Sequence, residues 1–146
     1  MPTLRELSPA ECDRLLRGGV MGRVAISTPD GPHLIPVNYS VVGDTLVIAT
    51  SPYSVLGAHG PGSRAVFEID DVDYERQGGW SVTAAGRMWV EDDADELAAI
   101  RAQWAPRPWA DGMRSLVLRM DLERVTGRRL GEGRDTLVPP VQRTRG

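Results

Sequence analysis

The sequence predicts a single, mainly β domain that folds as an antiparallel barrel or sandwich with two or three short helices on its flanks. Short apolar runs of strand length recur at regular spacing, and Gly, Pro and Asp residues separate them. Only two or three segments have the period of an amphipathic helix. An α+β sheet with one open face is the alternative that this pattern leaves.

Composition limits both the chemistry and the partners of the protein. The chain has 146 residues, the size of one domain, and its net charge of −3 offers no basic surface for nucleic acid or an anionic membrane. All 17 basic residues are arginine, which excludes Schiff-base chemistry at a lysine. Because the sequence has no long apolar stretch, no leader and a single cysteine, we expect a cytoplasmic protein without a membrane segment.

The first predicted element is a short helix near the N-terminus. Ser8 to Glu11 has the form of a capping box with proline at the first helical position, and the helix should continue to about Arg17. Cys12, Leu15 and Leu16 fall on one face of this helix. Nothing near Cys12 in the sequence would lower the pKa of its thiol, so we expect Cys12 to pack in the core rather than act as a nucleophile.

The stretch from Arg23 to Leu56 predicts three strands joined by tight turns. The strands are expected at residues 24–28, 34–39 and 45–50, where β-branched and apolar residues dominate. Pro29-Asp30-Gly31 and Gly43-Asp44 supply the turn residues between them. The first two strands should therefore form a hairpin.

A helix start is predicted directly after the third strand. Ser51 is a suitable N-cap, Pro52 a suitable first helical residue, and Ser54 a further hydroxyl in the first turn. The N–H groups at such a helix start favour an anion such as a phosphate. The helix should be short, because glycine and proline interrupt it from residue 57 onward.

Two further strands are predicted in the second half of the chain. The first covers residues 63–70, and the acidic segment from Asp70 to Asp73 is expected to be a solvated turn rather than a metal site. The second covers residues 79–91, where Gly86 should mark the bulge or bend that curls a sheet into a barrel.

A second helix, a closing strand and a tail complete the chain. Asp92 should cap the helix, and its buried face and proline stop are predicted at Leu97, Ile100, Trp104, Pro106 and Pro108. The closing strand covers residues 115–122, and residues 125–129 either continue its edge or turn off it. The domain should end at residue 131, so residues 1–131 form the barrel domain and residues 132–146 a loose C-terminal tail.

Several short motifs follow one another in order over nearly the whole chain. They are Leu4-x-Glu6-Leu7-Ser8, Gly22-Arg23-Val24-Ala25, Gly31-Pro32-x-x-x-Pro36-Val37-Asn38-Tyr39, Gly43-Asp44-x-Leu46-x-x-x-Thr50, Ser54-x-Leu56, Gly79-Trp80-Ser81-Val82 and Thr126-Gly127-Arg128-Arg129. This series resembles the pyridoxamine 5′-phosphate oxidase-like family of FMN-binding split-barrel proteins, closest to its short bacterial, nitroimidazole reductase-like members. The resemblance implies a six-stranded antiparallel Greek-key split barrel, a homodimer, and a flavin held in the dimer crevice.

The resemblance also implies which residues hold the cofactor. Pro36, Val37, Asn38 and Tyr39 would lie along the isoalloxazine ring, Thr50, Ser51 and Ser54 would reach the phosphate, and Trp80 and Trp109 would approach the ring from the same or the other subunit. Trp89 and Trp104 are expected to pack in the core. No catalytic residue is assigned, because hydride chemistry belongs to the cofactor. His33 and His59 have no carboxylate at triad or metal-ligand spacing, so no metal site is expected.

One departure from the family pattern bears on the cofactor. Relatives usually carry one or two basic residues directly after the serine equivalent to Ser54, whereas this chain has Val55 and Leu56. Arg64 and Arg23 are the nearest substitutes in sequence. Three outcomes stay open: FMN with a substitute arginine, a deazaflavin or other ligand, or a split barrel that has lost its flavin. The first two predict an oxidoreductase of the cytoplasm that acts on a small organic molecule, and the third a non-catalytic small-molecule-binding dimer.

Overall fold

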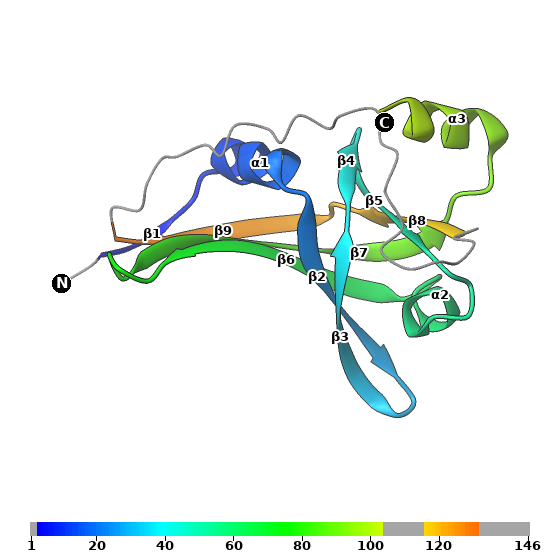
Figure 1. Cartoon of the computed structure of the whole chain (residues 1–146), viewed down its shortest axis with the longest axis horizontal. Helices are drawn as coiled ribbons and strands as arrows, with labels where there is room; N and C mark the ends of the chain where they lie inside the picture. Colours follow the sequence, from blue (N-terminus) through cyan, green and yellow to red (C-terminus); the bar gives the residue numbers. More distant parts are fainter. Residues whose placement is uncertain (1–2, 104–115, 132–146) are drawn as a thin grey trace.

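The computed structural model describes residues 3–103 and 116–131 (Figure 1). The strands are β1 (Leu4–Glu6), β2 (Met21–Thr28), β3 (Gly31–Asn38), β4 (Ser40–Val42), β5 (Thr45–Thr50), β6 (Arg64–Asp73), β7 (Gly78–Val90), β8 (Leu116–Asp121) and β9 (Arg124–Leu130). The helices are α1 (Pro9–Gly18), α2 (Val55–His59) and α3 (Ala94–Gln103).

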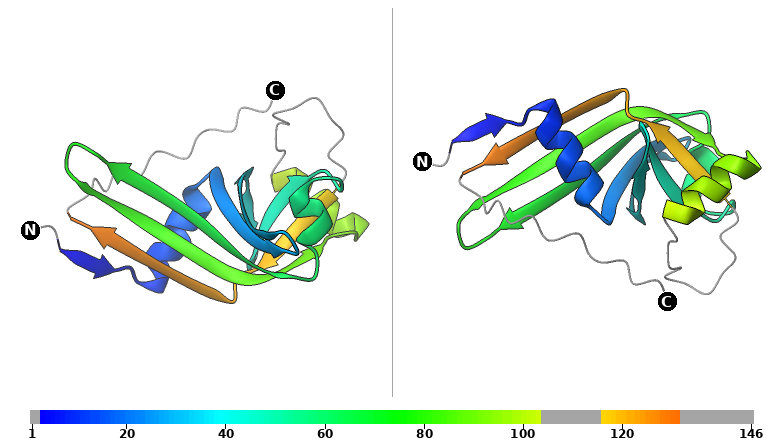
Figure 2. Two further views of the ribbon diagram at one scale, coloured as in Figure 1. Left: turned by 90° about the horizontal axis from the view of Figure 1, so that it is seen from below. Right: turned by 90° about the horizontal axis from the view of Figure 1, so that it is seen from above.

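The strands form one antiparallel sheet that wraps around a large core, and a smaller apolar cluster of Val42, Val47 and Ile100 lies beside α3. Its order is β3-β2-β6-β7-β8-β5-β4, with β9 paired to β7 and β1 paired to β9. The long strands β6 and β7 run through the middle, α1 lies on one part of the sheet, and α2 and α3 lie toward the opposite end (Figures 1 and 2). The predicted fold class, a mainly β antiparallel barrel with short flanking helices, is confirmed.

Nine strands are present in the described residues where six were expected. Two of the additional strands, β1 and β4, have only three residues each, too short for the alternation that marks a strand in sequence. The third is β9, which neither continues the β8 edge nor turns away. It is paired on both sides, with β7 and with β1.

Gly86 lies where β7 changes its partner. β7 pairs with β9 from Gly79 to Ala85 and with β8 from Met88 to Val90. A Cβ atom at Gly86 would collide with the carbonyl oxygen of Asp121, so only glycine lets the two backbones approach this closely. Gly86, where the sequence predicted a bulge or bend, is therefore the point at which β7 changes its partner from β9 to β8.

Helix α1 forms as its sequence predicts. The Ser8 hydroxyl accepts from the Glu11 N–H at 3.2 Å, and the Glu11 carboxylate accepts from the Ser8 N–H at 2.7 Å. Cys12 and Leu16 are buried, which confirms the core position of Cys12. Burial raises the pKa of the Cys12 thiol, with a smaller contribution from the neighbouring charge of Glu11.

Several predicted boundaries are wrong. Helix α2 is capped by Ser54 rather than Ser51, and Asp93 rather than Asp92 accepts hydrogen bonds from the first N–H groups of α3. The segment from Asp70 to Asp73 is not a turn, because it pairs with β7 and extends β6. Trp104, Pro106, Pro108, Trp109 and the tail at 132–146 lie outside the described residues.

The sheet has one buried face and one exposed face. Phe67, Ile69, Val82 and Ala84 point inward and are buried. On the other face, the cross-strand pairs place five residues in one line across β3, β2, β6, β7 and β9, and we call this line the outer row: Leu34, Ala25, Val66, Ala85 and Arg124. Leu34 is 68% exposed and Val66 is 40% exposed, so no described element covers this row.

Candidate functional site

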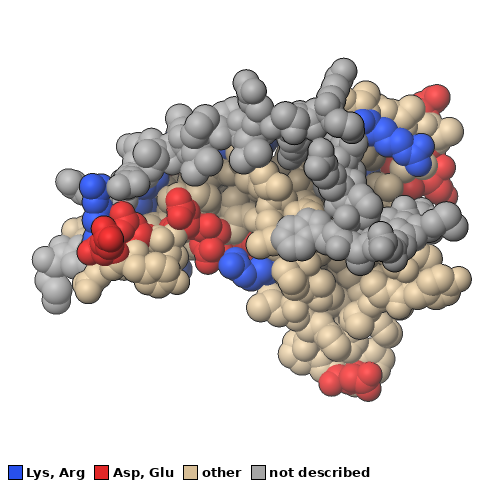
Figure 3. Space-filling model, viewed as in Figure 1, with Lys and Arg blue, Asp and Glu red and all other residues tan. Residues whose placement is uncertain are grey.

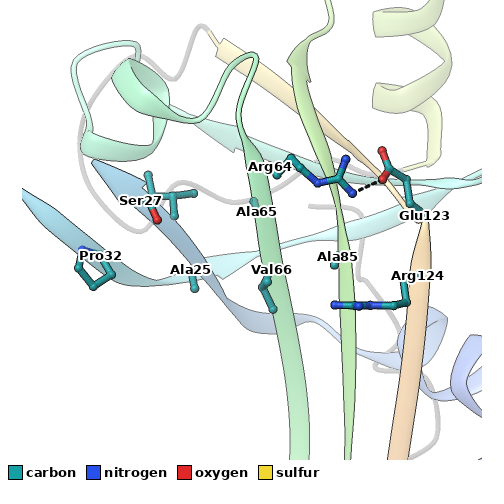
Figure 4. Close-up of a pocket in the computed structure, with 10 residues that line it drawn as sticks. Ala25, Ser27, Pro32, Arg64, Ala65, Val66, Ala85, Glu123 and Arg124 are labelled. Atoms are coloured by element: carbon teal, nitrogen blue, oxygen red, sulfur yellow. Dashed lines mark hydrogen bonds and ion pairs between the residues drawn. The ribbon is translucent and has the colours of Figure 1, made fainter. Parts of the chain in front are cut away.

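A cavity of about 580 Å³ lies against the outer row (Figure 4). The lining residues come from five strands and from the short connection between β8 and β9: Ala25, Ile26, Ser27, Pro32, Arg64, Ala65, Val66, Ala85, Glu123 and Arg124. The side chains that form its floor are mostly small, since alanine occupies both the β2 and the β7 positions of the outer row. The cavity is therefore a broad slot on the sheet surface rather than a deep hole in the core.

Charge gathers at one side of this slot. Arg64 at the start of β6 forms an ion pair with Glu123, and Arg124 extends from β9 across β7 (Figure 4). Arg124 has no hydrogen-bond or ion-pair partner in the described parts of the chain. Two arginines and one glutamate leave a net charge of +1 on the cavity wall. This side of the slot can therefore bind an anionic group.

Of the two arginines that the sequence offered as substitute cations, the structure brings one to the cavity. Arg64 lines it, whereas Arg23 lies farther along the same face and pairs with Glu68 at 3.3 Å and Asp70 at 3.4 Å. Arg124 is a second cation that the sequence analysis missed. Strand alternation could have found it only if β9 had been recognised as a strand paired to β7.

Glu68 is held in an unusual environment beside Arg23. Its Oε2 atom accepts from Arg23, but Oε1 is buried without a hydrogen-bond partner among the described residues. Burial, followed by repulsion from Asp70, raises the pKa of Glu68, and the Arg23 guanidinium only partly opposes this. The outer face therefore carries a carboxyl that holds its proton more readily than an ordinary glutamate does.

The predicted ring-binding residues of β3 divide between the two faces. Pro36 and Asn38 share the outer face with Pro32 of the cavity, although Pro36 is four residues from it, roughly 13 Å along the strand. Val37 packs against the core instead. Tyr39 is fully buried, and its hydroxyl donates to the Leu16 carbonyl while its ring meets Phe67 edge-on at 4.6 Å.

Two of the three hydroxyls proposed for the phosphate, those of Thr50 and Ser54, lie together at the start of α2. The Ser54 hydroxyl lies 2.8 Å from that of Thr50, donates to the Ser51 carbonyl at 2.7 Å and accepts from the Gly57 N–H at 3.0 Å. The Ser51 hydroxyl accepts from the Tyr53 N–H at 3.2 Å. These bonds cap a helix of only five residues, so the local structure already occupies the Ser54 hydroxyl.

The two apolar residues after Ser54 have different environments. Leu56 is 1% exposed and belongs to the core, so a basic side chain at this position would be buried. Val55 is 40% exposed. Of these two positions, only position 55 could therefore present a basic side chain to a phosphate. Helix α2 packs against β2, beyond the end that carries Ser27 (Figure 4).

Tryptophans do not line the cavity in the part of the chain described. Trp80 lies on the face of β7 that packs against the core, opposite to Ala85. Trp89 is half-buried and belongs to neither core cluster of the described residues; its indole N–H donates to Asp121 at 3.2 Å, and the Arg119 guanidinium lies 5.5 Å from its ring centre. Trp109 is not described.

None of the eight described residues predicted to bind the cofactor lines this cavity. A role for them in a cofactor site stays a prediction. They form two sets outside the cavity: Pro36 and Asn38 on the same sheet face as Pro32, and the hydroxyl-bearing residues at the start of α2. No group of three or more His, Cys, Asp or Glu side chains suited to a metal occurs in residues 3–103 and 116–131.

Charged side chains are distributed unevenly over the surface. Asp30 is the single acidic residue of the β2–β3 hairpin and lies at its turn, further acidic side chains lie at one end of the long sheet, and the flank of the hairpin is uncharged in this view (Figure 3). Strand β3 contains no Asp, Glu or Arg. In the described residues, no helix is both long and apolar enough to cross a bilayer.

Comparison with known proteins shows where this chain has relatives. A family model described as pyridoxamine 5′-phosphate oxidase matches residues 8–129. The uncharacterised protein Rv0080 of Mycobacterium tuberculosis is 32% identical over 130 residues, a match that covers 86% of this chain and 84% of that protein.

Solved structures share the fold at low sequence identity. A candidate pyridoxamine 5′-phosphate oxidase from Corynebacterium glutamicum has a TM-score of 0.75 at 24% identity, covering 92% of this chain and 98% of its own. An FAD-binding protein from Mycobacterium smegmatis has a TM-score of 0.67 at 24% identity, and the match covers 87% of this chain and 98% of that protein's chain. A candidate 5-nitroimidazole antibiotic resistance protein from Bacteroides thetaiotaomicron has a TM-score of 0.67 at 14% identity, and the match covers 88% of this chain and 89% of that protein's chain.

At these identities the structural likeness shows the shared fold, and the family match carries the assignment. Because that match covers most of the chain, and because the antiparallel sheet is that of the solved relatives, the chain belongs to the pyridoxamine 5′-phosphate oxidase family.

Proposed function

We propose that this protein is a flavin-dependent oxidoreductase that binds its cofactor in the cavity on the outer row and acts there on a small organic molecule. FMN is the favoured cofactor and a deazaflavin the alternative. The single observation that carries the proposal is the combination, in one slot, of a small-residue floor with two arginines at its side. Membership of a family with an FAD-binding structural relative supports it.

The residues present fit a flavin in size and in chemistry. A volume of about 580 Å³ lies inside the range of roughly 300–1,000 Å³ that small-molecule sites occupy. Ala25, Val66 and Ala85 offer a low apolar surface on which a flat ring can lie. Arg64 and Arg124 offer the cations that a phosphate needs, in place of the basic residues missing after Ser54.

Each part of the slot then has a distinct task. The alanine floor would exclude water from one side of the ring, while Arg64 and Arg124 would hold the phosphate at the edge and so orient the ring on the sheet. The Ser27 hydroxyl, at the β2 side, is available to hydrogen-bond ligand or substrate. When bound, the flavin supplies hydride transfer, and the protein contributes binding and orientation.

We also propose a homodimer that covers the outer face. The outer row exposes Leu34 and Val66 side by side with the two alanines, and a single chain leaves this apolar line in water. A second copy related by a two-fold axis would close the slot from above and could bring side chains that one chain keeps distant from it. A cytoplasmic location accompanies this proposal.

A non-catalytic binding protein is the second candidate. The observation that favours it is the turn after β5, where Ser54 is occupied by local hydrogen bonds and Val55 supplies no cation. The visible spectrum of protein purified without added cofactor, followed by titration with FMN and a deazaflavin, separates the two candidates. Tight binding of either, with reduction by a chemical donor and reoxidation by an added acceptor, supports the oxidoreductase, whereas absence of any flavin binding rejects it.

The variant Val55→Lys tests where the phosphate lies. If the phosphate lies between Arg64 and the start of α2, the added cation should tighten FMN binding by about 1–2 kcal/mol, roughly five- to thirtyfold, with a smaller gain at high salt. Riboflavin has no phosphate and should gain almost nothing. Calorimetric titration of both ligands decides this: equal gains would mean that the lysine acts through packing or net charge, and no gain would place the phosphate elsewhere.

A further inference from the structure

Arg64 already has an anionic partner inside the proposed site. Its guanidinium pairs with the carboxylate of Glu123, and both side chains line the cavity together with Arg124 (Figure 4). Glu123 is fixed in place by its backbone, because its N–H donates to the carbonyl of Ala85 at 3.2 Å. A ligand phosphate that approaches Arg64 therefore meets a carboxylate in the same position.

The exposure of this pair shows that it can exchange. The side chains of Arg64 and Glu123 are 64% and 39% exposed, so water can replace either partner. A second arginine–glutamate pair in the same chain is built differently. Arg119 and Glu91 are only 10% and 6% exposed, and Arg119 also binds Thr45 and Glu96 and stacks on Trp89. That pair is buried and held by several further contacts, whereas the Arg64 pair is open to water.

We propose that Glu123 is an internal counter-ion that competes with the anionic group of the ligand for Arg64. In the empty protein it neutralises one of the two cations, and on binding a phosphate takes its place while the Glu123 carboxylate turns to water. Glu123 therefore limits the affinity of the slot for anions and disfavours those too weak to displace it. This inference rests on the proposed function for the identity of the ligand, but not for the anion site itself.

The test compares Glu123→Gln with the unaltered protein by calorimetric titration of FMN, riboflavin and inorganic pyrophosphate. Glutamine keeps the backbone contact with Ala85 but cannot neutralise Arg64. FMN and pyrophosphate should bind about two- to tenfold more tightly to the variant, and riboflavin should bind equally to both proteins. The double variant Glu123→Gln/Arg64→Gln should lose the whole gain, because Arg64 is then absent.

A matched control removes one negative charge elsewhere. Glu75 is an exposed acid in the β6–β7 hairpin, and Glu75→Gln should leave all three affinities unchanged. Unchanged or weaker FMN and pyrophosphate binding in Glu123→Gln overturns the inference, as does an equal gain for riboflavin or for Glu75→Gln. If no flavin binds but pyrophosphate gains in Glu123→Gln alone, the inference stands and the flavin proposal fails.

Discussion

Two glutamates of this protein show how the same side chain acquires opposite properties from its neighbours. The Arg5 guanidinium, with help from the Ser8 N–H, lowers the pKa of Glu11 to about 2. Burial and the nearby Asp70 raise the pKa of Glu68 instead. Glu11 serves a helix cap at the surface, and Glu68 lies on the outer face one line of residues beyond the cavity floor.

The two shifts predict opposite pH dependence of stability. A lowered pKa contributes stability that is present above the unfolded-state pKa of about 4.5 and is lost as the pH falls toward 2. A raised pKa means that the folded state holds its proton more tightly, so Glu68 contributes most stability at low pH and loses it as the pH rises from about 4.5 through the folded-state value.

Denaturant unfolding of Glu68→Gln and Glu11→Gln from pH 3 to pH 8 measures this. Glu68→Gln should gain stability relative to the unaltered protein as the pH rises, because the buried charge is gone. Glu11→Gln should become less stable relative to the unaltered protein over the same rise in pH, because only the unaltered protein gains the ion pair between Glu11 and Arg5. If the stability of both variants relative to the unaltered protein changed with pH in the same way, neither carboxyl would have the environment described above.

At the scale of secondary-structure elements, strand β7 organises the fold. It pairs with β6 along most of its length, and on its other edge it pairs first with β9, over the longer part, and then with β8. The change of partner requires the backbone of β7 to pass very close to Asp121, which Gly86 permits. The cavity depends on this geometry, because Ala85 precedes Gly86 and Glu123 follows Asp121 by two residues.

We therefore expect Gly86→Ala to destabilise the fold by about 3 kcal/mol or more, since the added methyl would meet backbone that cannot move independently. Gly18→Ala, at the end of α1, is the matched control, because a Cβ atom added there would meet no other atom within 4 Å. That variant should be neutral or more stable by about 0.5–1 kcal/mol. Thermal unfolding of both variants measures the difference. An unchanged stability of Gly86→Ala would contradict the close approach of the β7 backbone to Asp121.

For the whole molecule, the exposed outer row is the feature that one chain does not explain. Leu34 is the most exposed apolar side chain of this row, at 68%. If a second copy covers the face, Leu34→Asp places a charge in an apolar interface and should shift the protein toward a monomer at micromolar concentration. Light scattering of the unaltered protein should give twice the chain mass.

Ala98→Asp, at an exposed position of α3, adds the same charge away from this face and should remain a dimer. Retention of the dimer by Leu34→Asp would exclude the outer row as the interface. If the unaltered protein stayed monomeric at high concentration, the proposal that a second copy closes the slot would be wrong.

Local interactions were determined by the sequence itself. The capping box at Ser8, the β2–β3 hairpin turn, and the alternation of buried Ala65, Phe67 and Ile69 with more exposed residues all follow from short-range chemistry, and the structure confirms each. The ordered motifs likewise identified the family.

The tertiary structure decided which residues meet. Ala25, Arg64, Ala85 and Arg124 lie far apart in the chain and come together only because β2, β6, β7 and β9 pair in a particular register. It also decided that Ser54 rather than Ser51 caps α2 and that Tyr39 belongs to the core. Alternation within one strand determines which of its faces is buried, but which distant strand pairs with it depends on packing between segments far apart in the chain.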